Sequence, residues 1–149
     1  MTYRIVTEIE IDARPEEVWK HLTDLRSFSE WNPFMIEGSG KVEVGARLKV
    51  RMQQPGGSAM TFKPTVTEAT APERFEWLGS LVFPGLFDGR HRFELMPTAS
   101  GTHLIHSEEF NGVLVPLLRR SLDTRSRAGF ETMNQALKAR VEDTVHHPA

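Results

Sequence analysis

The sequence predicts an α+β fold in which an antiparallel sheet is covered by one long C-terminal helix. Three observations predict it. Residues 3–11 alternate apolar with mostly charged side chains, as a half-buried strand does. Strand-like segments separated by short turns fill residues 46–110. From residue 113 to about residue 143 the apolar period changes to that of an amphipathic helix.

Two short helices are expected directly after the first strand. Pro15 suits the first position of a helix, and the two glutamates that follow it suit the positive end of the helix dipole. Asp24 can cap a second short helix, which ends before Pro33 because a residue that precedes proline disfavours helical backbone. The Asn-Pro pair then predicts a turn, and a turn rich in glycine and serine follows.

The middle of the chain predicts a meander, because short turns join consecutive strand signals. Pro64 lies inside one of these signals and indicates an edge position or a bulge. The strand signals of this region cover residues 46–53, 59–69, 75–83, 87–96 and 102–110. Together with the first strand, these signals predict an antiparallel sheet of about six to seven strands.

The last third predicts one helix over residues 113–143. Pro116 fits its first turn, and Gly129 interrupts it at a cost of about 1 kcal/mol against alanine. An apolar stripe along one side makes this helix the natural cover of the sheet. The stripe consists of Leu118, Leu122, Phe130, Met133, Leu137 and Val141.

Composition limits the possible functions. The length of 149 residues predicts a single domain spanning residues 1–149. The chain has no cysteine, which excludes disulfides, thiolate metal sites and a cysteine nucleophile. Neither a membrane span nor an apolar signal core is expected, so a cytoplasmic protein is the plain reading. The net charge of −2 argues against a nucleic-acid partner.

Three segments carry a family likeness: "IEIDARPEEVWKHLTDLRSFSEWNPF", "LFDGRHRFEL" and "GTHLIHSEEFNGVLVPLL". Over about residues 3–142 the chain resembles the START-like, birch-pollen-allergen-like (SRPBCC) superfamily, in its small bacterial polyketide cyclase/dehydrase branch. The resemblance implies a helix-grip fold, in which a curved antiparallel sheet wraps the long helix and leaves a cavity between them. It implies binding or transport of hydrophobic ligands, and in some members cyclisation of aromatic polyketides. No catalytic motif of the branch can be matched here.

The resemblance places the segment after the second short helix at the mouth of the cavity. Trp31 and Phe34 are therefore candidate rim or wall residues, although they can equally close the core beneath the short helices. Asn32 joins them as a candidate contact, with turn formation as the competing role. Gly79 and Gly89 share the inferred concave face and favour open space there. The other apolar candidates, which can also simply fill the core, are Met52, Phe62, Trp77, Phe93, Phe110, Phe130 and Met133.

Three polar candidates share the same concave face. His106 and Glu108 lie two residues apart on one expected strand, and His91 lies on the strand before it. Buried polar groups need partners, so these three can satisfy one another or bond to the long helix. They can also orient the polar end of a ligand or act in acid–base catalysis. A metal site of two histidines and a carboxylate is geometrically possible, but we predict no metal and no cofactor.

These features predict a protein that binds, and in some settings transports, a hydrophobic small molecule without catalysis. The first alternative is a cofactor-independent cyclase or aromatase acting on a polyketide or aromatic substrate. The second alternative is a protein-interaction module that works through its outer surface. A monomer or a homodimer is expected, and the sequence does not identify the ligand.

Overall fold

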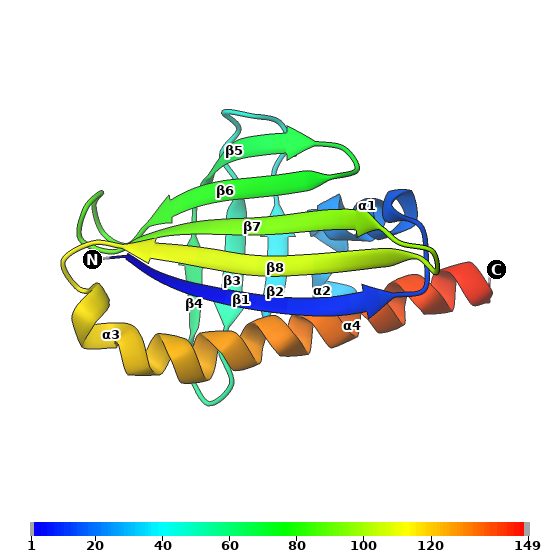
Figure 1. Cartoon of the computed structure of the whole chain (residues 1–149). Coiled ribbons are helices and arrows are strands. Elements are labelled where there is room, and N and C mark those ends of the chain that lie inside the picture. Colours follow the sequence, from blue (N-terminus) through cyan, green and yellow to red (C-terminus); the bar gives the residue numbers. More distant parts are fainter. Residues whose placement is uncertain (1, 148–149) are drawn as a thin grey trace.

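The computed structural model describes residues 2–147 and confirms the α+β architecture (Figure 1). Residues 1 and 148–149 of the predicted domain 1–149 lie outside the described residues. The described chain forms one sheet in the order β1-β8-β7-β6-β5 and another in the order β2-β3-β4. The first comprises β1 (Thr2–Ile11), β5 (Thr65–Thr70), β6 (Arg74–Ser80), β7 (Asp88–Pro97) and β8 (Thr102–Asn111). The second comprises β2 (Met35–Ser39), β3 (Lys49–Gln53) and β4 (Ala59–Phe62).

The two short helices follow β1 as expected. They are α1 (Pro15–Thr23) and α2 (Phe28–Trp31), with a single 3₁₀ turn, Leu25–Ser27, directly before α2. Pro15 occupies the first turn of α1, as predicted. The expected cap is wrong, because the Asp24 side chain makes no capping hydrogen bond. The backbone carbonyl of Asp24 instead accepts a hydrogen bond from the Ser27 hydroxyl at 2.7 Å.

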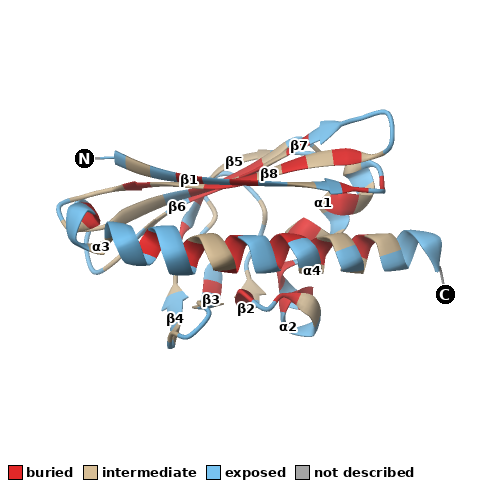
Figure 2. Ribbon diagram, turned by 60° about the horizontal axis from the view of Figure 1, so that its bottom comes forward, coloured by how far each residue is buried: buried red, intermediate tan, exposed pale blue. Residues whose placement is uncertain are grey.

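The long C-terminal helix is confirmed as one continuous element between the two sheets (Figure 2). It consists of α3 (Val115–Ser121), a π-helical turn (Leu122–Ser126) and α4 (Arg127–His146). Its predicted apolar stripe is buried from Leu122 to Val141, while Leu118 is half-buried. The other side of the helix is largely exposed, so the 3.6-residue period was the correct interpretation. No helix within residues 2–147 is long and apolar enough to cross a membrane.

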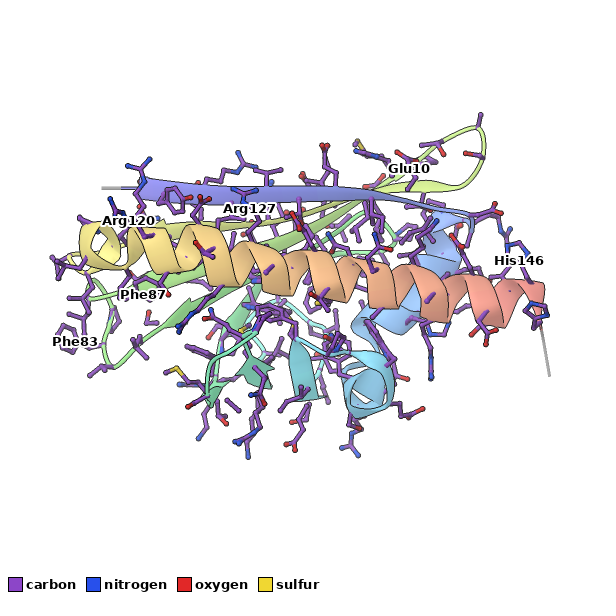
Figure 3. The ribbon with its side chains drawn as sticks, turned by 90° about the horizontal axis from the view of Figure 1, so that it is seen from below. Glu10, Phe83, Phe87, Arg120, Arg127 and His146 are labelled. Atoms are coloured by element: carbon purple, nitrogen blue, oxygen red, sulfur yellow. The ribbon has the colours of Figure 1, made fainter. Side chains whose placement is uncertain are left out.

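The structure corrects the strand boundaries around Pro64. The predicted strand 59–69 is two strands, β4 and β5, which belong to different sheets. Pro64 lacks an N–H and ends the ladder of β4, and its carbonyl accepts the Leu48 N–H at 2.8 Å. The strand expected at 75–83 ends at Ser80. Phe83 is therefore not in the inward row; it is 55% exposed and lies at one end of the molecule (Figure 3).

The turn expected after Asn32-Pro33 contains an additional strand, β2. This strand pairs with β3 and packs against the 3₁₀ turn. A Cβ at Gly38 would lie 3.0 Å from the Leu25 carbonyl oxygen and 3.2 Å from the Phe28 ring. Glycine therefore permits this close packing, which the local sequence did not indicate.

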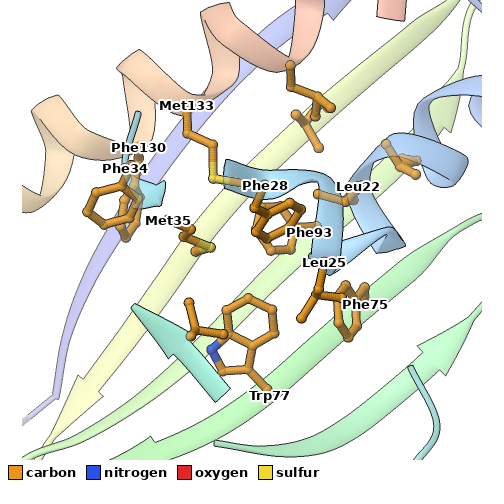
Figure 4. Packing of buried hydrophobic residues seen from close by; sticks show 14 of the residues in the cluster. Leu22, Leu25, Phe28, Phe34, Met35, Phe75, Trp77, Phe93, Phe130 and Met133 are labelled. Carbon is orange, nitrogen blue, oxygen red and sulfur yellow. The ribbon is translucent and has the colours of Figure 1, made fainter. Parts of the chain in front are cut away.

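The core lies between the five-stranded sheet, the long helix and the short helices (Figure 4). Phe75, Trp77 and Phe93 of the sheet form a chain of ring contacts with centroids 5.2–6.2 Å apart. On the helix side, Phe130 packs against the Phe34 ring at 5.6 Å. Aromatic packing of this kind stabilises the closed part of the fold beyond simple area burial.

Candidate functional site: a cavity beside a buried histidine pair

Inward-facing residues cross strands β6, β7 and β8 in three registered rows. Successive rows are two residues apart on each strand, because side chains alternate between the faces of a sheet and every second one points inward. Side-chain volume falls sharply from the second row to the third. The rows are Phe75–Phe93–His106, Trp77–His91–Glu108 and Gly79–Gly89–Phe110.

A cavity of about 130 Å³ opens at the glycine row. Most of its lining is apolar, and it lies between the sheets and the π-helical turn of the long helix. Its size is close to that of an engineered protein cavity, about 150 Å³, that holds benzene. The lining residues are Phe34, Met52, Gln54, Ser58, Met60, Phe62, Pro64, Trp77, Gly79, Ser80, Leu81, Phe87, Gly89, Glu108, Phe110, Leu122 and Ser126.

The structure brings only part of the predicted set to this cavity. The residues that line it are Phe34, Met52, Phe62, Trp77, Glu108 and Phe110. Those that lie deeper, packed within the core, are His91, Phe93, His106, Phe130 and Met133. Trp31 packs edge-on against Phe28, away from the cavity. A ligand-binding role for any of these residues stays a prediction.

Other lining residues were missed. Met60 and Pro64 had a usable signal, because they alternate with Phe62 along the same segment. Gln54 and Ser126 had none, since they are far apart in the chain. Gln54 Nε2 donates to Ser126 Oγ at 2.8 Å and joins the end of β3 to the long helix. Only the tertiary structure reveals this contact.

The Asn32-Pro33 turn positions Phe34 at the boundary between cavity and core. Asn32 Oδ1 accepts hydrogen bonds from the backbone N–H groups of Phe34 at 3.0 Å and Met35 at 2.8 Å. Asn32 is therefore a turn former in this structure. A Cβ at Gly129 would lie 2.5 Å from the Phe34 ring, so glycine in the helix makes room for that ring. Phe34 serves both expected roles, because it closes the core and also lines the cavity.

The two buried histidines belong to a polar network that joins the sheet to the long helix. Thr7 Oγ donates to the His106 carbonyl at 2.8 Å, and Asn134 Nδ2 donates to Thr7 Oγ at 2.9 Å. The Asn134 carbonyl oxygen lies 2.7 Å from His106 Nδ1, and the Nε2 atoms of His106 and His91 are 2.6 Å apart. The two histidines thus contact each other, and His106 also bonds to the helix, which agrees with the structural roles that the sequence left open beside ligand binding and catalysis.

The directions of these hydrogen bonds fix the protons. Because the side-chain amide nitrogen of Asn134 donates to Thr7, its Oδ1 accepts a hydrogen bond from the protonated Nδ1 of His106. Burial first, and the neighbouring His91 second, hold the pKa of His106 well below its usual value, so His106 is neutral. Its Nε2 must then accept, and His91 donates from Nε2. The remaining nitrogen of His91, Nδ1, faces Glu108.

Glu108 stands between this network and the cavity. Its Oε1 lies 3.2 Å from His91 Nδ1, but that nitrogen is not aligned for a hydrogen bond and has no other partner among the described residues. Within residues 2–147, no group of three histidine and carboxylate side chains could hold a metal ion.

Comparison with known families identifies the class of protein. The family model described as polyketide cyclase/dehydrase and lipid transport matches residues 2–142. The chain belongs to this family, and its helix-grip architecture agrees with the resemblance that the sequence showed. No curated protein matches the chain.

Solved structures share the fold at low sequence identity. The Zhui aromatase/cyclase from Streptomyces has a TM-score of 0.79 at 12% identity, covering 97% of this chain and 96% of that one. The di-domain aromatase/cyclase StfQ of the steffimycin biosynthetic pathway has a TM-score of 0.80 at 14% identity, covering 97% of this chain and 52% of that one. A protein from Mesorhizobium loti has a TM-score of 0.73 at 24% identity, covering 95% and 98%.

Proposed function

We propose that this protein binds a small hydrophobic molecule in the cavity at the Gly79–Gly89 row. The observation that carries the proposal is the cavity itself, with its apolar walls and a few convergent polar groups. Membership of a family described by polyketide chemistry and lipid transport supports a hydrophobic ligand. The volume of about 130 Å³ suits a ligand part of about one ring, and the cavity is partly open, so that a second ring can extend toward the surface.

Binding of naphthalene, measured by equilibrium dialysis, tests the proposal. Gly79→Val places two methyl groups toward the cavity and is expected to weaken binding at least about tenfold, as loss of a well-filled apolar site does. Leu78→Val is the matched control, because Leu78 directly precedes Gly79 in β6 and its side chain lies on the opposite face of the sheet. Its binding should equal that of the wild type. Equal binding by Gly79→Val, with an unchanged thermal midpoint, would show that the cavity is not the site.

A second candidate function is a cofactor-independent cyclase or aromatase reaction. The observation that favours it is Glu108, the only ionisable side chain among the described residues that line the cavity. A carboxylate there would take a proton from the carbon between two ketone groups of a substrate. That carbanion would form a carbon–carbon bond to another ketone as its C=O π bond opens, and the resulting alkoxide would take the proton back from Glu108. The fold is shared with aromatase/cyclases, which supports the proposal without identifying a substrate.

Turnover of a synthetic poly-β-ketone tests this second candidate. Glu108→Gln should lower kcat by about 10²–10⁴-fold, the usual contribution of a general base. Naphthalene binding should persist in the same variant. Turnover that Glu108→Gln leaves unchanged removes Glu108 from the reaction.

A further inference from the structure

We propose that Glu108 is the specificity-determining residue of the cavity: it anchors neutral ligands that carry a hydroxyl donor and excludes carboxylic acids. This inference rests on the proposed binding function and names the ligand class of the same site. The position of the Glu108 carboxyl group, the acceptor character of a carboxylate and the charges around the cavity support it.

The carboxyl group of Glu108 has a close neighbour on each of two sides. On one side Oε1 lies 3.2 Å from His91 Nδ1, on the neighbouring strand. On the other side Oε2 lies over Gly89, where any Cβ would overlap it. Gly89 itself lines the cavity, and the Glu108 side chain is 13% exposed. Glycine therefore gives the carboxyl group its place beside the cavity.

Oε2 of the Glu108 carboxylate can only accept hydrogen bonds from a ligand. A carboxylate has no proton to donate, and each of its oxygens is an acceptor. A ligand beside Oε2 therefore gains a hydrogen bond only by donating one.

The charges around the cavity argue against anionic ligands. No lysine, arginine or histidine is among the described residues that line it. A ligand carboxylate would lose its hydration and meet Glu108 without a counter-ion, which is costly in an apolar site. The other side chains with polar atoms are Gln54, Ser58, Trp77, Ser80 and Ser126, and the amide of Gln54 is already bonded to Ser126. These groups are uncharged, so Glu108 is the one charged group among the described lining residues that repels an anion while accepting from a donor.

Three probes with the same ring system separate these effects: naphthalene, 2-naphthol and 2-naphthoate, measured by equilibrium dialysis at neutral pH. The wild type should bind 2-naphthol at least about threefold more tightly than naphthalene, a modest net hydrogen bond. It should bind 2-naphthoate at least about tenfold more weakly, because a desolvated like charge is repelled.

Two variants assign the discrimination to Glu108. Glu108→Leu removes both acceptor and charge, so naphthalene and 2-naphthol should bind within about twofold of each other. Glu108→Gln keeps a carbonyl acceptor without the charge, so the preference for 2-naphthol should remain. In both variants 2-naphthoate should bind more tightly than it binds the wild type, because only the loss of its hydration still opposes binding. Glu109→Gln is the control, because Glu109 is the next residue of β8 on the opposite face and should leave all three affinities unchanged.

The outcomes distinguish this inference from the function on which it rests. Failure of naphthalene to bind the wild type overturns both. Binding of all three probes with equal affinity leaves the cavity in place and overturns the role of Glu108. The same holds if Glu108→Leu still prefers 2-naphthol to naphthalene as the wild type does. If Glu108→Leu does not fold, Glu108→Gln decides, because affinity for 2-naphthoate as weak as that of the wild type contradicts the inference.

Discussion

The space between the long helix and the five-stranded sheet differs between its two ends. At the sealed end, defined by Phe93, His106 and Phe130, aromatic rings fill the space completely and each residue is at most 1% exposed. The His106 and Phe130 rings stack with centroids 4.4 Å apart. At the open end, defined by Gly79, Gly89 and the π-helical turn, the same sheet and helix enclose a cavity.

This difference arises from side-chain volume along two paired strands. The Phe75–Phe93 pair and the Trp77–His91 pair are two positions apart along the strands, and the Gly79–Gly89 pair lies two positions further on. The backbone arrangement is continuous across all three pairs. A closed core and a binding cavity can therefore share one sheet, and the boundary between them is the row that contains His91 and Glu108.

The largest expected effect is on the sealed end. Phe130→Ala should lower the free energy of unfolding by about 3–5 kcal/mol, because it leaves a cavity among fully packed rings. Leu122→Ala at the open end should cost about 2 kcal/mol, the low end of its class, because empty space already adjoins that side chain. Urea denaturation measures both. Equal losses would show that the two ends are packed alike.

A smaller effect is expected at Gly129, where the helix meets the Phe34 ring. Helix propensity alone predicts that Gly129→Ala stabilises the protein by about 1 kcal/mol. The contact predicts the opposite, because the new Cβ would lie 2.5 Å from that ring. We expect a net loss of about 1–3 kcal/mol, the usual cost of overpacking a core. The sign of the change in urea denaturation decides between the two explanations.

Two histidines on opposite faces of β8, His106 and His103, should have opposite effects on how stability depends on pH. Because the pKa of buried His106 is lowered, the unfolded chain binds a proton at this histidine as pH falls below 6.5, whereas the folded chain does not. The free energy of unfolding should therefore decrease as pH decreases, with a slope approaching about 1.4 kcal/mol per pH unit for this one proton. His106→Gln should show a smaller slope when unfolding is measured between neutral pH and pH about 5.

His103, on the outer face of the same strand, provides the control. Hydrogen bonds first to Glu8 and then to Glu10 raise its pKa, so its stabilising contribution is present at low pH and lost as pH rises through the folded value. His103→Gln should therefore make the protein less stable at low pH, the reverse of the effect at His106. Parallel pH curves for the wild type and both variants would contradict this assignment.

The sequence predicted the elements whose periodicity is strong. The alternation in β1, β7 and β8 and the stripe from Leu122 to Val141 each gave the correct buried face, because side-chain direction follows from backbone geometry. Strand β2 was missed because Gly38 and Ser39 are poor strand formers, and the strand depends on contacts with Leu25, Phe28 and β3. Such contacts are tertiary and leave no local pattern.

The sequence predicted which residues of the candidate site share one face of the sheet, but not which of them lie beside the cavity and which are buried in the core. Alternation correctly put His91, His106 and Glu108 on one face. It could not show that Phe130 of the helix covers the two histidines while Glu108 stays beside the cavity. That distinction depends on where helix side chains lie over the sheet. Gly79 and Gly89 were the one sequence feature that indicated the position of the open space.

The smallest expected effect contrasts Gly79 at the open end with Gly129 in the long helix. A Cβ at Gly79 would lie 3.5 Å from Pro64, an ordinary van der Waals contact, so Gly79→Ala needs no rearrangement. It should raise the free energy of unfolding by about 0.5–1 kcal/mol, because alanine restricts the unfolded chain more than glycine does. Gly129→Ala should have the opposite sign. If both substitutions destabilise the protein in urea denaturation, the space at Gly79 is already filled, and the distinction between the open end and the sealed end fails.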